Sequence, residues 1–138
     1  MEIRCYRPGD FDGVDSLWNE AFPNDPPRNR AIHAVPEKLA VQPDLFFVAL
    51  AGDAVIGTIM AGYDGHRGWL YAVTVRRAAH RGGVGTALVR HAEAALRALG
   101  CAKINLQVRS GNEAVVRFYE RLGYAVEPRI SMGRLLQP

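Results

Sequence analysis

The sequence has few cysteines and no apolar run long enough to cross a membrane. Cys5 and Cys101 are its only thiols, they form no C-x-x-C motif, and its four histidines include no H-x-x-x-H pair. We therefore expect neither a disulfide framework nor a metal site. No apolar stretch reaches the roughly 18 residues of a membrane-spanning helix, and no signal-peptide pattern is found. These absences predict a cytoplasmic protein without a membrane partner.

Strong charge of one sign is also missing. The 17 Lys and Arg residues against 14 Asp and Glu give a net charge of +3. The basic residues form no clustered stripe of the kind that binds nucleic acid, so we expect no nucleic-acid partner. With 138 residues, of which 49% are hydrophobic, the chain has an ordinary globular composition. Residues 1–138 are therefore expected to form a single domain.

Two familiar phosphate-binding motifs are absent. No G-x-x-x-x-G-K sequence is followed by Ser or Thr, which excludes a P-loop. The dinucleotide fingerprint needs a third glycine three residues after the second, but Gly83 and Gly85 are followed there by Leu88. A nucleotide site of either of these types is therefore not predicted.

The sequence does contain a different glycine-rich stretch, His80-Arg-Gly-Gly-Val-Gly-Thr86, between a strand-like run at 69–75 and a helix-like run at 84–99. Such a turn presents unpaired backbone N–H groups at a helix N-terminus, where the helix dipole favours an anion. Nearby positive charge comes from Arg76, Arg77 and Arg81. The stretch indicates a phosphorylated small molecule, and its alternative is a tight turn that only packs the helix on a sheet.

Hydrophobic periodicity predicts a mixed α+β fold, with helices on the faces of a sheet. Five of the eight prolines fall in the irregular segment 22–45, which has room for a short helix at 28–35 and is typical of a binding loop. The other expected helices cover 11–21, 84–99 and 112–122. Strands are expected at 3–7, 45–50, 54–63, 69–75, 103–108, 124–126 and 131–136.

Two motifs together resemble the GNAT acetyltransferases. The glycine-rich stretch resembles the family's Gln/Arg-x-x-Gly-x-Gly/Ala loop, and Asn112-Glu-Ala-Val-Val-Arg-Phe-Tyr119-Glu-Arg-Leu-Gly-Tyr124 resembles its second signature. The elements expected between them are also those of the family, so the resemblance covers nearly the whole chain. A small bacterial subgroup shares the turn Gly62-Tyr-Asp-Gly-His-Arg-Gly68.

The resemblance implies a mixed, mostly antiparallel sheet of six to seven strands flanked by about four helices. It also implies acetyl-coenzyme A as donor, an amine as acceptor, no metal, and a monomer or homodimer. The alternative is a non-catalytic module that senses acyl-coenzyme A for a protein partner. The residues that the resemblance places against the coenzyme are Ala72, Val73, Val75, His80, Arg81, Gly82, Gly83, Val84, Gly85, Thr86, Asn112 and Tyr119.

Several roles follow from the same resemblance. Backbone amides of 81–86 would hold the pyrophosphate, and backbone groups of Val73 and Val75 would pair with the pantetheine arm. The amide of Tyr71, or of its neighbour Ala72, would face the thioester oxygen and stabilise the developing negative charge. Tyr119 would be the general acid that protonates the leaving thiolate, unless it is only a core aromatic.

Asn112 would contact a pantetheine amide, and it also suits the N-cap of the helix that follows. The acceptor side would be formed by the loop 22–27, the turn 63–69 and the loop 127–131.

The sequence departs from the family pattern at two places. His80 stands where the family has Gln or Arg, and Gly82 replaces a basic residue. Since backbone amides hold most of the phosphate, we expect binding to survive. We expect it to be either weaker or more pH-sensitive, because histidine changes charge near pH 6.5. Arg67 stands where some members have a catalytic glutamate. The candidate general base is then His66, with Asp64, Glu20, Asp25 or a water chain as alternatives.

Overall fold

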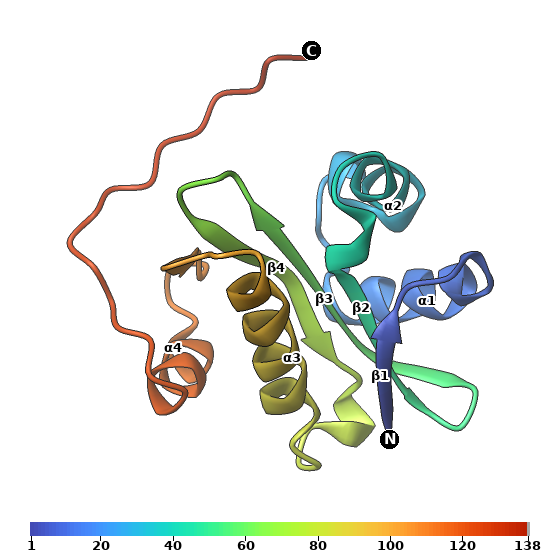
Figure 1. The fold of residues 1–138 in the computed structure, drawn as a ribbon. Coiled ribbons are helices and arrows are strands. Elements are labelled where there is room, and N and C mark those ends of the chain that lie inside the picture. Colours follow the sequence, from blue (N-terminus) through green and yellow to red (C-terminus); the bar gives the residue numbers. More distant parts are fainter. Residues whose placement is uncertain (138) are drawn as a thin grey trace. The chain divides into compact units, whose positions relative to one another are not determined.

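The computed structural model describes residues 1–137, which divide into two compact units. The first unit is Met1–Gln107, and the second begins at Val108. A single sheet with helices on both faces makes up the first unit, and the second contains helix α4 (Glu113–Arg121) (Figure 1). The expectation of a single domain stays a prediction.

The sheet of the first unit has five strands in the order β1-β2-β3-β4-β5. The first four are antiparallel to their neighbours, and β5 runs parallel to β4. The prediction of a mixed, mostly antiparallel α+β fold is therefore confirmed. The strands are β1 (Glu2–Cys5), β2 (Phe46–Ala51), β3 (Ala54–Tyr63), β4 (Gly68–Val75) and β5 (Ile104–Leu106).

Three details of the expected element pattern were wrong. The described residues contain five strands rather than six to seven, because 124–126 and 131–136 form no strand. A strand forms only where a neighbouring strand pairs with it, and the strand pairs of the described residues include neither segment. The short helix expected at 28–35 is instead α2 (Ala31–Ala40). It begins late because Pro27 starts a separate 3-10 turn and Arg30 is extended (φ −71°, ψ 150°).

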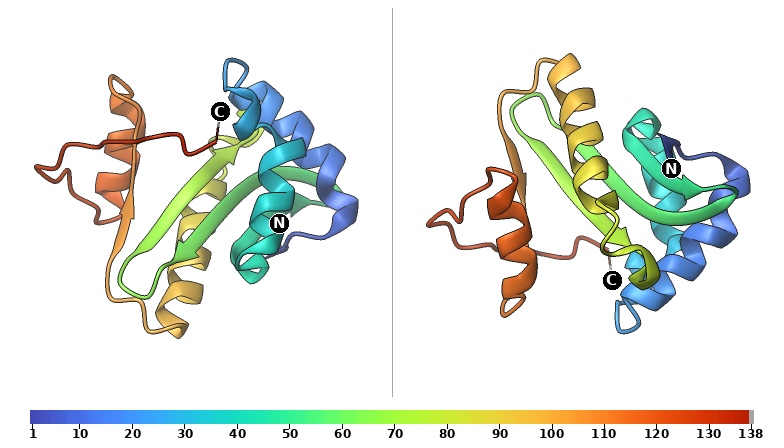
Figure 2. Two further views of the ribbon diagram at one scale, coloured as in Figure 1. Left: turned by 90° about the horizontal axis from the view of Figure 1, so that it is seen from above. Right: turned by 90° about the horizontal axis from the view of Figure 1, so that it is seen from below.

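Helices cover both faces of the sheet. Helix α3 (Val84–Ala98) packs on one face, while α1 (Phe11–Ala21) and α2 lie on the other (Figure 2). Apolar residues recur along α1 and α3 at helical spacing, so each helix buries one stripe. The core between α1, α2 and the sheet consists of Val14, Leu17, Trp18, Ala31, Val35, Phe46, Val48, Leu50, Val55 and Met60.

A bulge interrupts β4 where it pairs with β3. Thr58 is opposite Thr74 and Met60 is opposite Tyr71, so two residues of β4 lie opposite one residue of β3. The extra residue is accommodated at Ala72, whose φ is +51°. A positive φ is unfavourable for a residue with a Cβ, and such strain persists only where surrounding contacts hold it. Bulges bend a strand and redirect its backbone groups.

Strand β4 also has an open edge. Strand β5 pairs with β4 only over Gly68–Leu70. Among the described residues, 71–75 therefore have a strand neighbour on the β3 side alone. This edge begins at the bulge and ends near the glycine-rich loop, so it joins the two features that the sequence singled out.

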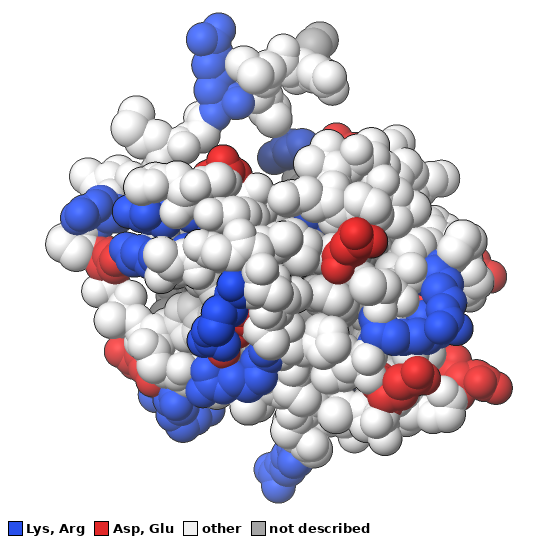
Figure 3. Space-filling model, in the orientation of Figure 1, with Lys and Arg blue, Asp and Glu red and all other residues white. Residues whose placement is uncertain are grey.

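The surface carries charges of both signs. On the face shown in Figure 3, Lys and Arg side chains lie among Asp and Glu side chains. Arg90 and Glu93 on α3, for example, form an ion pair of 2.7 Å between Nη1 and Oε1. None of the helices within residues 1–137 combines the length and the apolar character needed to cross a bilayer.

Candidate active site

Hydrogen-bonded and non-hydrogen-bonded residue pairs alternate along β4, and this alternation determines which backbone groups face the open edge. Asp64 N–H donates to Arg67 O at 3.2 Å, so these two residues form a hydrogen-bonded pair. In an antiparallel ladder every second pair exchanges hydrogen bonds, and the register therefore makes Met60 and Tyr71 a hydrogen-bonded pair as well. The Tyr71 amide is therefore directed into the sheet, away from the position expected for it. Beyond the bulge, Arg76 N–H donates to Ile56 O at 2.7 Å, which turns the N–H and C=O of Val75 to the open edge.

Side chains beneath the sheet hold the bulge. The Trp18 indole Nε1–H donates to Thr58 Oγ1 at 2.9 Å, and the Thr58 hydroxyl donates to Ala72 O at 2.8 Å. Thr58 is fully buried. Sequence reasoning missed this residue, although a hydroxyl within the apolar run of 54–63 was a signal, because a buried polar group needs a partner.

The glycine-rich loop leads directly into α3. Gly83 is its N-cap with φ +74°, and the first helical hydrogen bond runs from Ala87 N–H to Gly83 O at 3.0 Å. Within the described chain, the amides of Val84, Gly85 and Thr86 have no acceptor. They form the anion-binding end that a helix N-terminus provides.

Other groups of the loop are already engaged. The Gly82 amide donates to Ala79 O at 3.2 Å and the His80 amide to Arg77 O at 3.3 Å. The Arg76 side chain donates to Val55 O at 2.8 Å and to Gly13 O at 3.3 Å. Arg76 therefore ties β3 and α1 together.

The His80 side chain reaches the open edge of β4. Its Nε2 lies 2.8 Å from Val75 O, a backbone carbonyl that faces this edge. A carbonyl only accepts, so the ring nitrogen donates. The side chain that departs from the family pattern therefore occupies a backbone group expected to pair with pantetheine.

The second unit presents Tyr119 on α4. The side chain is 8% exposed and makes edge-on ring contacts with Phe118 at 5.0 Å and Tyr124 at 5.6 Å. Burial raises the pKa of Tyr119 to about 12. The phenol is therefore protonated at neutral pH, as a proton donor must be, while its ring also packs in the unit's interior.

Asn112 caps α4. Its Oδ1 accepts a hydrogen bond from Val115 N–H at 3.4 Å. The capping alternative for this residue is confirmed, and the contact with pantetheine stays a prediction.

The structure does not bring His66 to the bulge. His66 is exposed in the turn between β3 and β4, where its own amide and that of Arg67 donate to Asp64 Oδ1 at 2.8 and 2.7 Å. These backbone hydrogen bonds, from Arg67 and then His66, lower the pKa of Asp64. Six residues at about 3.3 Å each place His66 roughly 20 Å along the chain from Ala72. Direct proton transfer between these two places is therefore disfavoured.

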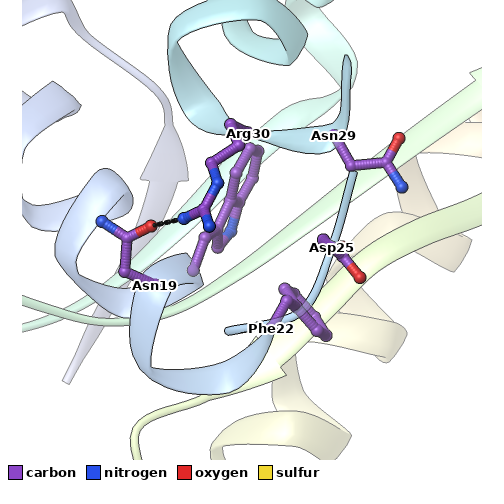
Figure 4. Close-up of a pocket in the computed structure, with 6 residues that line it drawn as sticks. Asn19, Phe22, Asp25, Asn29 and Arg30 are labelled. Atoms are coloured by element: carbon purple, nitrogen blue, oxygen red, sulfur yellow. Dashed lines mark hydrogen bonds between the residues drawn. The ribbon is translucent and has the colours of Figure 1, made fainter. Parts of the chain in front are cut away.

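A shallow pocket lies between the end of α1 and the start of α2. Figure 4 shows Asn19, Phe22, Asp25, Asn29 and Arg30 around it, and Trp18 completes the lining. Arg30 Nη1 donates to Asn19 Oδ1 at 2.5 Å. The pocket includes part of the expected acceptor loop 22–27, and its Trp18 is the residue that donates to Thr58.

Lys38 was not expected to matter. It is 6% exposed, its Nζ donates to Ala61 O at 2.5 Å, and the nitrogen lies 5.6 Å from the centroid of the Tyr71 ring. Burial lowers the pKa of Lys38 and raises that of Tyr71. The Lys38 ammonium lies over the Tyr71 ring at a distance typical of a cation–π contact, on the face of the sheet that carries α2.

Comparisons with known proteins identify the family of this chain. A family model described as "Acetyltransferase (GNAT) family" matches residues 11–124. The chain belongs to the GNAT acetyltransferase family. An acetyltransferase of Pectobacterium atrosepticum is 39% identical over 99% of this chain and 96% of its own length. An acetyltransferase of Sodalis glossinidius is 41% identical over 94% of this chain and 91% of its own length.

A solved structure shows the same fold. The PaiA N-acetyltransferase of Thermoplasma acidophilum, in complex with coenzyme A, has a TM-score of 0.80 at 19% identity, over 94% of this chain and 92% of that one. Within the GNAT family, the matched range 11–124 contains the bulge, the glycine-rich loop and Tyr119. It also contains His80, Gly82 and Arg67, so the chain matches the family model in spite of these three departures from the family pattern.

Proposed function

We propose that this GNAT protein transfers the acetyl group of acetyl-coenzyme A to a primary amine, by direct attack within a ternary complex. The observation that carries the proposal is the open edge of β4, which begins at the bulge and ends beside the α3 N-terminus. An extended molecule with amide groups pairs with such an edge as an added strand does. Its phosphate groups then reach the unpaired amides of the helix.

The residues present fit the coenzyme. Val84, Gly85 and Thr86 would bind the pyrophosphate through their backbone N–H groups, and Val75 would pair with the pantetheine arm after the His80 ring leaves its carbonyl. The Gly82 amide, which donates to Ala79 O, would contribute less than expected. The coenzyme A bound to the similar Thermoplasma acidophilum protein supports this choice of ligand.

In the proposed reaction, Tyr119 donates the proton that the leaving group needs. The amine nitrogen forms a bond to the acetyl carbon, the carbon–sulfur bond breaks, and the leaving thiolate takes the phenol proton. Since the Tyr119 pKa is about 12, the donor form is fully populated at neutral pH. The amine gives its excess proton to water, and the Tyr119 phenolate takes a proton back from water.

The pocket of Figure 4 is the place we propose for the acceptor. It lies on the face of the sheet that carries α1 and α2, and it shares Trp18 with the hydrogen-bonded chain that ends at Ala72. The acceptor would therefore approach the bulge from one side of β4. Asp25 supplies a carboxylate for an ammonium group, and Phe22 supplies an apolar wall.

The test is to incubate the protein with acetyl-coenzyme A labelled with ¹³C at the acetyl carbonyl and a panel of primary amines. The panel contains simple alkylamines, amino-acid amides and short peptides with free N-termini. We expect at least one amine to yield free thiol and ¹³C-labelled N-acetyl product in equal amounts. Coenzyme binding without thiol release across the panel would contradict a transferase and favour the sensing module.

A further inference from the structure

A buried chain of polar groups runs from α1 through β3 to the bulge in β4. Trp18 Nε1 lies 2.9 Å from Thr58 Oγ1, which lies 2.8 Å from Ala72 O. Trp18 is 5% exposed and Thr58 is fully buried, so water does not compete for these hydrogen bonds. The three residues come from three different elements, and the chain ends at the one residue of β4 with a positive φ.

The direction of both hydrogen bonds is fixed by the groups themselves. An indole N–H can only donate and a backbone carbonyl can only accept, whereas a hydroxyl has one proton and two lone pairs. Trp18 therefore uses a lone pair of the Thr58 hydroxyl, whose single proton goes to Ala72 O. Neither end can reverse, so the Thr58 hydroxyl has one orientation.

The orientation of the Ala72 carbonyl determines the orientation of the next amide, that of Val73. The peptide bonds of the described chain are trans, and in a planar trans peptide the C=O and the next N–H point in opposite directions. Because Ala72 O points to Thr58, on the β3 side, the N–H of Val73 points away from β3. That is the open edge of β4, and the register has already turned the Tyr71 amide away from this edge.

We propose that Thr58, itself held by Trp18, is a positioning residue that fixes the Val73 N–H as the donor to the thioester oxygen. This inference rests on the function proposed above and changes the donor from the amide expected at Tyr71 to that of Val73. The Ala72 amide follows the Tyr71 carbonyl, which points to β3, so it faces the open edge as well, but only the Val73 amide follows the carbonyl that Thr58 holds. A donor aimed in advance at the developing negative charge lowers the barrier without reorganisation during the reaction. Without the Thr58 hydroxyl, the peptide between Ala72 and Val73 loses the hydrogen bond that holds the bulge.

The experiment compares Thr58→Val with Thr58→Ser. Valine keeps the shape of threonine and removes both hydrogen bonds, whereas serine retains the hydroxyl. Trp18→Phe removes only the first donor, and it keeps the series informative if Thr58→Val fails to fold. Val55→Ala is the control, because it removes buried volume from the same core at a position whose cross-strand partner is Leu50 rather than Thr58.

Two readouts separate positioning from general destabilisation. The first is the isotope-edited infrared stretch of the ¹³C=O thioester carbonyl in bound acetyl-coenzyme A, which shifts to lower frequency when the oxygen accepts a hydrogen bond. The second is kcat, with KM for acetyl-coenzyme A, using an amine that the wild-type protein acetylates in the panel.

We expect Thr58→Val to lose most of the infrared shift and to lower kcat roughly 10- to 100-fold, with KM for acetyl-coenzyme A within about twofold. Thr58→Ser should retain the shift, Trp18→Phe should lose part of it, and Val55→Ala should leave it unchanged. An unchanged shift and kcat in Thr58→Val would overturn the positioning role alone. A wild-type protein that binds no acetyl-coenzyme A would overturn the proposed function as well.

Discussion

Burial sets the chemistry that Tyr119 has available. Its phenol is nearly enclosed, and the desolvation of the anion raises its pKa to about 12. The same packing that makes the ring a core residue therefore keeps it in the proton-donating form. The two alternatives that the sequence left open for this side chain, core aromatic and acid, are therefore compatible, and the role as acid stays a prediction.

Tyr119→Phe should lower kcat about 10²- to 10⁴-fold while leaving the Kd for acetyl-coenzyme A nearly unchanged, because only the transferable proton is lost. Steady-state kinetics and calorimetric titration measure the two quantities. With a folded-state pKa of about 12, Tyr119 remains protonated from pH 7 to 10, so it should cause no loss of wild-type kcat in that range. Full activity in the phenylalanine variant would remove the assignment as acid.

His80 should weaken coenzyme binding rather than assist it. Its Nε2 occupies Val75 O, and this hydrogen bond must break before pantetheine can use the carbonyl. Since a hydrogen bond is worth about 0.5–1.5 kcal/mol net, His80→Ala should tighten acetyl-coenzyme A binding about two- to tenfold. Calorimetric titration measures the change, and His66→Ala is the matched control. Weaker binding in His80→Ala would show that the ring contacts the coenzyme directly.

At the scale of elements, α3 and the sheet approach each other closely at one glycine. A Cβ added to Gly57 of β3 would lie 2.9 Å from Leu88 Cδ1, 3.1 Å from Thr74 O and 3.3 Å from Val84 Cγ1. Val84 is the first residue of α3, so this contact sets the distance between the helix N-terminus and the sheet. The glycine-rich loop alone does not decide where its amides point.

Gly57→Ala should therefore destabilise the fold by about 1–3 kcal/mol, because the helix or the strand must shift to admit the methyl group. Chemical denaturation monitored by circular dichroism gives the free energy of unfolding. Gly9→Ala is the control, since a Cβ there meets nothing within 4 Å, and it should stay within about 0.5 kcal/mol of wild type. Equal stability of the two variants would contradict the close packing of α3 at this point.

The sequence predicted most of these elements, and the reasons for the exceptions are local. Helices α1, α3 and α4 have strong apolar periodicity and caps or stop signals at their ends, so their residues were predicted nearly correctly. The start of α2 depends on the backbone angles of Arg30, which composition does not reveal. Segments 124–126 and 131–136 have strand-like residues, but strands form only where a neighbour pairs with them.

The site was predictable only in part for a similar reason. Spacing located the glycine-rich loop and Tyr119, because each belongs to a motif that is continuous in sequence. The bulge, and the contacts of Thr58 and His80 with the backbone of β4, arise from register and from residues far apart in the chain. No local pattern encodes a register shift, so the amide at Tyr71 was expected in a direction that the sheet does not allow.

For the molecule as a whole, acid sensitivity should come in part from one buried carboxylate. Asp10 is 7% exposed, accepts from Arg4 Nη1 and Nη2 at 2.7 and 3.0 Å, and accepts from Arg7 N–H at 2.8 Å. The Arg4 hydrogen bonds, opposed by desolvation and aided by the Arg7 amide, lower the pKa of Asp10. The carboxylate joins β1 to the start of α1, near the N-terminal edge of the sheet.

A lowered folded-state pKa means that this stabilisation is present above the unfolded value of about 3.9 and is lost as pH falls through the folded value. Asp10→Asn should therefore cost about 2 kcal/mol at pH 7, and the difference from wild type should shrink below about pH 4. Thermal melts of both proteins from pH 7 to pH 3 measure this difference. A difference that stays constant over that range would contradict the role of the charged carboxylate.

The central claim, that the open edge of β4 and the α3 N-terminus together bind acetyl-coenzyme A, is tested most directly by a thermal melt with and without this ligand. ATP serves as the control, since it carries phosphates but no pantetheine arm. At 100 times its Kd, acetyl-coenzyme A should add about 2.7 kcal/mol of stability, whereas ATP should add little. Equal stabilisation by both ligands, or none by acetyl-coenzyme A, would contradict the claim.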